Sequence, residues 1–339
     1  MSLIWNNNIS VSYFGEAHDP VIGVTIAGLP EGEHIDAEAL ISFLKRIAPK
    51  SCGGTSVPSP RIMSGIRNDR TTGAPLCAIL KNCGVEEEVD EPQSPSLRAG
   101  NADYTGAVRY KGYCDVKKAA HAPERFVSAL CVAGAVCGQI LERRGIYTGA
   151  HIAAIHNIKD NPFDPVNISR DGILSIRIKD LPVISDRKGW IMLEDISMAA
   201  ECGESLGGVV ECASVNVPCG VGSPVFDGLE NNIASLVFGI PGIAGIEFGA
   251  GFSSAAMVGS QYSDGSFTDG KGYSVTKTNS HGGIIGGISS GMPITLRAAV
   301  KPPKIGGDCV CAVPGAVVCV EAAVNIALLS NMLDYPNFC

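Results

Sequence analysis

Residues 279–294 read Asn-Ser-His-Gly-Gly-Ile-Ile-Gly-Gly-Ile-Ser-Ser-Gly-Met-Pro-Ile, with five glycines among the ten residues 282–291. Ordered glycine is entropically costly, so such a cluster indicates positive φ angles, close packing of elements, or a backbone that approaches a ligand. A flexible linker would lack the interspersed isoleucines, which indicate burial. The run therefore predicts an ordered, buried segment. It serves either as a wall for a flat or phosphorylated ligand or as a tight contact between two elements.

The composition of the whole chain is that of a globular α+β protein. Its 339 residues are 45% hydrophobic and 18% charged, which is enough to bury a large core. The formal net charge of −8 argues against nucleic acid or an anionic membrane as a general partner. An anionic small molecule would need a local cluster of Arg and Lys. Because no stretch has the composition of a linker, we expect a single large domain over residues 1–339.

The 13 cysteines are an odd number, and they are scattered among apolar residues without a repeated spacing. No segment resembles a signal peptide, so they are interpreted as free thiols in a reducing cytoplasm. Only Cys309 and Cys311 lie close together in sequence, and we expect no metal site. The apolar stretch 317–329 contains Glu321 and Asn325 and predicts a buried helix, not a membrane span.

Hydrophobic periodicity predicts the main elements. Residues 36–47 form an amphipathic pattern with Asp36 as a plausible N-cap. Residues 122–144 are predicted to form the longest helix, with small residues on its buried face that allow close packing. Strands are predicted at residues 150–158 and 208–217.

Residues 203–207 read Gly-Glu-Ser-Leu-Gly and match the Gly-x-Ser-x-Gly pattern of hydrolases. In those enzymes a strand precedes the serine and a helix follows it. Here a helical pattern precedes the motif and a strand pattern follows it, which argues against a serine hydrolase.

Several further blocks occur in a fixed order along the chain. They are Phe14-Gly15-Glu16-Ala17-His18-Asp19-Pro20, Thr71-Thr72-Gly73-Ala74-Pro75-Leu76, Arg98-Ala99-Gly100-Asn101-Ala102-Asp103-Tyr104-Thr105, Glu201-Cys202-Gly203-Glu204-Ser205-Leu206-Gly207-Gly208, Gly245-Ile246-Glu247-Phe248-Gly249 and Lys301-Pro302. Together with the glycine run, these blocks resemble the chorismate synthase family over most of the chain.

The resemblance implies a layered β-α-β sandwich that assembles as a homotetramer. It also implies an anti-1,4 elimination of phosphate from 5-enolpyruvylshikimate 3-phosphate, which gives chorismate in the shikimate pathway to aromatic amino acids. The family requires reduced FMN, which donates charge transiently, and uses two histidines as proton donors. Arginines and lysines hold the anionic groups.

Three positions correspond by resemblance to catalytic residues. His18 stands in the first motif, where it is either the retained proton donor or a polar residue in a turn before Pro20. Asn101 takes the place of the second histidine, and an asparagine does not deliver a proton at neutral pH. Asp308 falls in the family's closing block, from which the arginine and the histidine are missing.

Further positions correspond by resemblance to cofactor contacts. The family's Arg-Ser-Ser block falls on His121, Ala122 and Pro123, with Arg125 retained beyond it. Two glycines, Gly242 and Gly283, fall on flavin contacts. Lys301 and Lys304 belong to the family's Lys-Pro-Thr-Ser-Ser segment, and Gly307 replaces an arginine.

Two functions remain open at this point. One is an FMN-dependent lyase that acts on a small anionic substrate. The other is a catalytically inactive or repurposed paralog that keeps the scaffold for binding or assembly. The retained glycines and His18 favour a ligand, whereas Asn101 and Gly307 favour altered chemistry.

Overall fold

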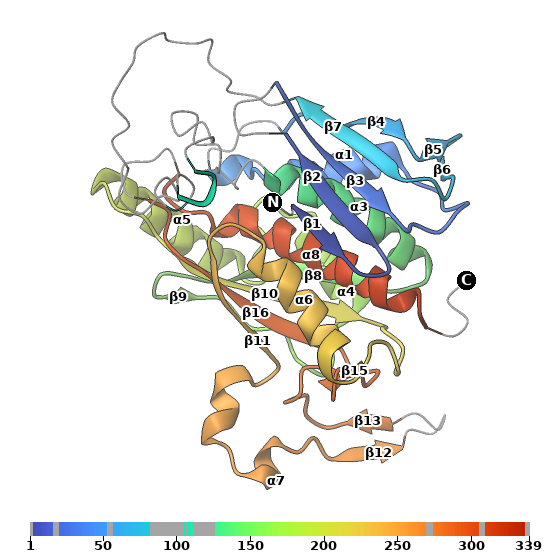
Figure 1. Cartoon of the computed structure of the whole chain (residues 1–339). Coiled ribbons are helices and arrows are strands. Elements are labelled where there is room, and N and C mark those ends of the chain that lie inside the picture. Colours follow the sequence, from blue (N-terminus) through green and yellow to red (C-terminus); the bar gives the residue numbers. More distant parts are fainter. Residues whose placement is uncertain are drawn as a thin grey trace.

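The computed structural model describes residues 3–15, 20–52, 57–81, 105, 108–111, 126–268, 274–304 and 309–335. Figure 1 shows two sheets with a layer of helices between them. One continuous hydrophobic core joins the inner faces of both sheets to these helices. The predicted α+β layered sandwich is therefore confirmed.

The first sheet is antiparallel, and β3 lies at its centre. Its strand order is β1 (Ile4–Asn6), β2 (Ser10–Phe14), β3 (Val21–Ala27), β7 (Leu76–Lys81) and β4 (Arg61–Ser64). Val24, Ile26 and Ala78 are fully buried, as expected for the inner strands. A short ribbon of β5 (Ile66–Arg67) and β6 (Arg70–Thr71) lies beyond β4 in Figure 1.

The second sheet is also antiparallel, with β10 at its centre. Its order is β11 (Ile243–Phe248), β16 (Ile294–Val300), β10 (Gly208–Val215), β8 (Tyr147–Ile155) and β9 (Ile158–Lys159). The strands predicted at residues 150–158 and 208–217 correspond to β8 and β10. Helix α4 (Arg170–Arg177) packs on β8, and α5 (Asp186–Glu201) contacts β9.

Two long helices form the middle layer, α3 (Val127–Arg143) and α8 (Val313–Met332). A Cβ on Gly134 would lie 2.2 Å from the Cα of Ala322, so the predicted close packing of small residues is confirmed. Within the described part of the chain α8 has 20 residues and α3 has 17. The prediction that residues 122–144 contain the longest helix is therefore wrong.

Helix α8 confirms the buried helix predicted at residues 317–329. It is long and apolar enough to cross a membrane, but 94% of its most apolar window is buried inside the protein. Helix α8 is thus a core helix, and its apolar character is due to neighbours on every side.

Two shorter helices complete this layer, α1 (Ala37–Lys45), which contacts α3, and α6 (Leu229–Phe238), which contacts α8. The carboxylate of Asp36 accepts hydrogen bonds from the N–H groups of Glu38 and Ala39, which confirms the predicted N-cap.

The remaining elements are short. They are the 3₁₀ helices η1 (Lys50–Cys52), η3 (Val225–Asp227) and η4 (Gly251–Ala256), helix α7 (Gly259–Tyr262), and the hairpins of β12 (Ser266–Thr268) with β13 (Ser274–Thr276) and β14 (Ile284–Ile285) with β15 (Ile288–Ser289). The last hairpin is formed by the glycine run.

Candidate functional site

Most of the predicted site residues lie outside the described part of the chain. These are His18, Asn101, His121, Ala122, Pro123, Arg125, Gly307 and Asp308. The structure does describe residues close to His18, Arg125 and Asp308, and it describes Gly242, Gly283, Lys301 and Lys304. We therefore locate the candidate site from these described residues.

The described residues before and after His18 lie at one end of the first sheet. Strand β2 ends at Phe14, which pairs with Gly23, and β3 begins at Val21, which pairs with Lys81 at the end of β7. Consecutive antiparallel strands are connected at the same end of a sheet. The connection from β2 to β3, which contains His18, therefore begins and ends at this end of the first sheet.

The beginning of α3 lies against β2. The rings of Tyr13 and Phe126 have centroids 6.2 Å apart, and Phe126 immediately precedes the first residue of α3. Phe126, the first described residue after Arg125, therefore lies beside the strand that precedes His18.

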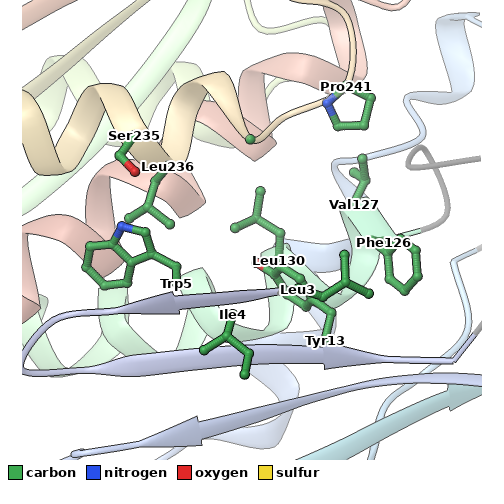
Figure 2. A pocket seen from close by; sticks show the side chains of 11 residues that line it. Leu3, Ile4, Trp5, Tyr13, Phe126, Val127, Leu130, Ser235, Leu236 and Pro241 are labelled. Atoms are coloured by element: carbon green, nitrogen blue, oxygen red, sulfur yellow. The ribbon is translucent and has the colours of Figure 1, made fainter. Parts of the chain in front are cut away.

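A cavity of about 350 Å³ lies at this junction. Strands β1 and β2, helices α3 and α6, and the turn after α6 form its walls, which Figure 2 shows. Its lining is mainly apolar and consists of Leu3, Ile4, Trp5, Tyr13, Phe126, Val127, Leu130, Ser235, Leu236, Gly239 and Pro241. In Figure 2 Pro241 lies toward the end of the cavity occupied by Phe126 and Val127, whereas Trp5 lies beside Leu236. We call this the apolar cavity. Burial raises the pKa of Tyr13, so its phenol stays neutral.

Lys301 is hydrogen-bonded to Gly242, the residue next to the cavity lining, and we call this place the rim of the apolar cavity. The backbone N–H of Lys301 donates to the carbonyl oxygen of Gly242 at 2.9 Å, and Gly242 follows the lining residue Pro241. Gly242 has φ +86°, which favours glycine, and a Cβ there would meet only Val300, at 4.0 Å. The structure thus brings together Gly242 and Lys301, two residues that are 59 positions apart in the sequence.

The side chains of Lys301 and Lys304 are both exposed. Within the described residues neither ammonium group forms an ion pair. They therefore provide positive charge without an ion-pair partner among the described residues, in a protein whose net charge is negative.

The glycine run is explained mainly by packing. Gly282 and Gly283 have positive φ angles, and a Cβ on them would lie 2.4 Å from the amide nitrogen of Gly249 and 2.5 Å from the carbonyl oxygen of Pro293. At Gly287, a Cβ would lie 2.2 Å from the carbonyl oxygen of Ser223. Of the two alternatives for this run, these contacts favour the tight packing of elements. No described contact joins Gly283 to Gly242 or Lys301, so the proposed flavin contact at Gly283 stays a prediction.

The motif at residues 203–207 follows α5 and precedes β10. The order is helix, motif, strand, which is the reverse of a hydrolase elbow, and the interpretation against a serine hydrolase is confirmed.

The guanidinium of Arg46, the residue that follows α1, is occupied by an ion pair. It donates to both carboxylate oxygens of Glu321, at 2.8 and 2.7 Å, and the Glu321 side chain is fully buried. Burial alone would raise the pKa of Glu321, but Arg46 outweighs it and holds the pKa below its usual range. Arg46 is therefore a structural residue.

A second cavity of about 650 Å³ lies on the outer side of the second sheet and is more polar. Lys277, Arg297, Glu211 and Asn279 are among its lining residues. Arg297 forms an ion pair with Glu247 at 2.7 Å, so Lys277 is its only lysine or arginine without an ion pair in the described residues. We call this the polar cavity.

Sequence reasoning missed the lining of the apolar cavity. Trp5 and Tyr13 lie in the paired strands β1 and β2, whereas Leu236 lies far away in the sequence, and each has an ordinary core pattern in its own segment. No local signal identifies such residues as a site.

The sequence is similar to those of chorismate synthases over most of its length. The family model for chorismate synthase matches residues 9–306. A chorismate synthase of Thermococcus kodakarensis is 34% identical over 350 residues, covering 96% of each chain. One of Lancefieldella parvula is 32% identical and covers 99% of this chain and 98% of the relative.

Solved structures agree with the family model. A crystal structure of chorismate synthase superposes with a TM-score of 0.82 at 28% identity, covering 97% of this chain and 93% of that one. Nothing in these comparisons favours a non-catalytic paralog. The match to the family model, the relatives of full length and the shared fold lead to one conclusion: the chain belongs to the chorismate synthase family.

Proposed function

We propose that this protein is a carbon–oxygen lyase that eliminates phosphate from 5-enolpyruvylshikimate 3-phosphate to give chorismate, with reduced FMN as cofactor. One observation carries the proposal. The apolar cavity joins Tyr13, Phe126 and Pro241, which lie next to three segments that the resemblance assigns to the site, and the hydrogen bond from Lys301 to Gly242 connects the fourth.

The residues of the apolar cavity fit the flavin of the family. Its walls suit a flat ring system and exclude water from one side. The space left open beside Gly242 lets a ligand approach the backbone, and Lys301 and Lys304 supply cations for a phosphate group. When bound, reduced FMN would supply electron density transiently to the reacting ring.

We assign anion binding and proton donation to residues of the chain itself. Lys301 and Lys304 would hold anionic groups by charge-assisted hydrogen bonds, each worth about 1.5–3 kcal/mol. Asn101 and Asp308 stand where the family has histidines, so we assign the main proton donor to His18. The apolar wall would strengthen these electrostatic interactions by lowering the local dielectric.

The finer properties of the protein belong to the same proposal. It would act in the cytoplasm as a homotetramer, on a small anionic substrate. Burial raises the pKa of Cys131, Cys137 and Cys212, so these thiols remain protonated and unreactive. This supports their interpretation as packing residues with free thiols.

The proposal is tested by incubating the purified protein anaerobically with 5-enolpyruvylshikimate 3-phosphate and reduced FMN. We expect chorismate and phosphate in equal amounts, no product when FMN is omitted, and at least a 100-fold loss in His18→Ala. If no chorismate forms at any protein concentration, the proposal is wrong and the inactive paralog is favoured.

A further inference from the structure

The turn between α5 and β10 contacts the chain on both sides of residues 305–308. The hydroxyl of Ser205 donates to the carbonyl oxygen of Pro303 at 2.7 Å. The N–H of the next residue, Leu206, donates to the carbonyl oxygen of Val310 at 2.8 Å. Two consecutive residues thus hold the chain just before and just after this segment.

The carbonyl oxygen of Pro303 receives its hydrogen bond from another segment because residues 301–304 do not continue strand β16. Strand β16 ends at Val300, and Pro302 and Pro303 have no backbone N–H to continue a ladder. The carbonyl of Pro303 still requires a partner when it is shielded from water. Ser205 is half-buried and supplies that partner from its side chain.

Gly207 lets the turn approach the same segment closely. A Cβ at this position would lie 2.6 Å from the carbonyl oxygen of Val300 and 2.9 Å from the nitrogen of Pro302. Its own carbonyl accepts a hydrogen bond from the N–H of His156 at 2.9 Å, which ties the turn to the second sheet. The turn is therefore fixed to the core on one side and to Pro302 and Pro303 on the other.

Lys301 is consequently held from two directions. Its N–H is bonded to Gly242 at the rim of the apolar cavity, and two residues later Pro303 is bonded to Ser205. Lys304 follows directly. Restraint at both places fixes the backbone from which the Lys301 and Lys304 side chains extend.

We propose that Ser205 is a positioning residue that fixes the Lys301–Lys304 segment so that its two cations face the anionic ligand. The proposal rests on the proposed function, because it takes the rim of the apolar cavity as the ligand site. It also gives the Gly-Glu-Ser-Leu-Gly motif a role as a structural clamp, in which the serine acts as a hydrogen-bond donor and not as a nucleophile.

The test compares Ser205→Ala with Ser205→Thr, which keeps the hydroxyl. Ser175→Ala is the matched control, because its hydroxyl also donates to a carbonyl at 2.7 Å, that of Gly172, on the exposed face of α4. We expect Ser205→Ala to raise the Kd for FMN and the KM for substrate about fivefold or more, with kcat changed less. Ser205→Thr should stay within about twofold of the unmodified protein, and so should Ser175→Ala.

A double-mutant cycle with Lys304→Ala tests the route of the effect. If Ser205 acts through the lysines, the two changes in Kd should combine to less than their product. Fully multiplicative effects, or an unchanged Kd in Ser205→Ala, would overturn the proposal. Should Ser205→Ala fail to fold, Ser205→Cys, a weaker donor of similar shape, takes its place with the same expected direction.

Hydrogen exchange does not depend on catalysis, so it tests this proposal separately from the proposed function. Hydrogen exchange at the Lys301 and Leu206 amides should be about fivefold faster in Ser205→Ala and unchanged in Ser175→Ala. Unchanged exchange would refute the clamp even in an active enzyme. Absence of chorismate from the unmodified protein would refute the proposed function and leave the exchange result to decide on the clamp.

Discussion

Glu321 is the most consequential buried charge in the middle layer, and replacing it by glutamine keeps its volume while removing the charge. The carboxylate accepts two hydrogen bonds from Arg46 and a third from the N–H of Ala150 at 2.9 Å. In Glu321→Gln an amide NH₂ group takes the place of one carboxylate oxygen, so a donor faces a donor. Arg46, whose side chain is 16% exposed, loses its principal counter-charge.

Breaking one side of a buried, hydrogen-bonded ion pair costs about 3–5 kcal/mol. Folded domains have total stabilities of about 5–15 kcal/mol, so the variant should lose a large fraction of its free energy of unfolding. Arg46→Met should cost a similar amount, since it leaves the Glu321 carboxylate uncompensated except by Arg177, whose Nε lies 3.7 Å away. The double variant, Arg46→Met with Glu321→Gln, should be more stable than the two single losses predict, because neither charge of the pair is then left without its partner.

The assay is equilibrium unfolding in urea, followed by circular dichroism for the four members of this cycle. A loss below about 1 kcal/mol in Glu321→Gln would refute the assigned role of the pair, as would simple additivity. Arg46→Met should also leave the Kd for FMN within about twofold in the folded protein, because its guanidinium is already occupied. A large loss of FMN affinity at unchanged stability would place Arg46 in the ligand site.

Two further predictions concern the glycine run and a buried histidine. Gly283→Ala should reduce the free energy of unfolding by at least about 2 kcal/mol more than Gly286→Ala, because both positions have positive φ but only at Gly283 would the Cβ meet backbone, at 2.5 Å; equal losses in urea unfolding would contradict this. His151 is fully buried, and although burial alone would lower its pKa, its hydrogen bonds with Asp160 and Glu211 raise the pKa above the usual value. The contribution of the protonated His151 to the free energy of unfolding should therefore be complete below about pH 6.5 and be lost as the pH rises through the folded-state pKa. In His151→Gln the free energy of unfolding should fall less steeply above about pH 6.5 than in the unmodified protein. An unchanged pH profile in the variant would exclude this role.

The fold could be predicted largely because its signals are local. Asp36 caps α1 through its own neighbours, and the apolar stretch around Glu321 has the composition of a buried helix. The order of the sequence blocks that resemble the chorismate synthase family indicates the layered sandwich. Helix lengths were less predictable: β-branched residues such as Val317 and Val318 weaken the helical signal of α8, whose stability comes from burial on every side.

The site was less predictable because its walls are tertiary. Trp5 and Leu236 meet only when β1 packs against α6, and no periodicity in either segment marks them. Lys301 could be found by resemblance, yet its partner Gly242 gives no sign of the contact in the sequence. The role of Arg46 was hidden for the same reason, since its partner Glu321 lies 275 residues away.

The affinity for FMN of two lysine variants, one at each cavity, decides which cavity holds the cofactor. Lys301 lies at the rim of the apolar cavity and Lys277 lines the polar cavity, and both side chains are exposed. Fluorescence titration with FMN should show that Lys301→Ala raises the Kd about tenfold or more, whereas Lys277→Ala leaves it within about twofold. A loss of affinity in Lys277→Ala with none in Lys301→Ala would place the cofactor in the polar cavity and contradict the account.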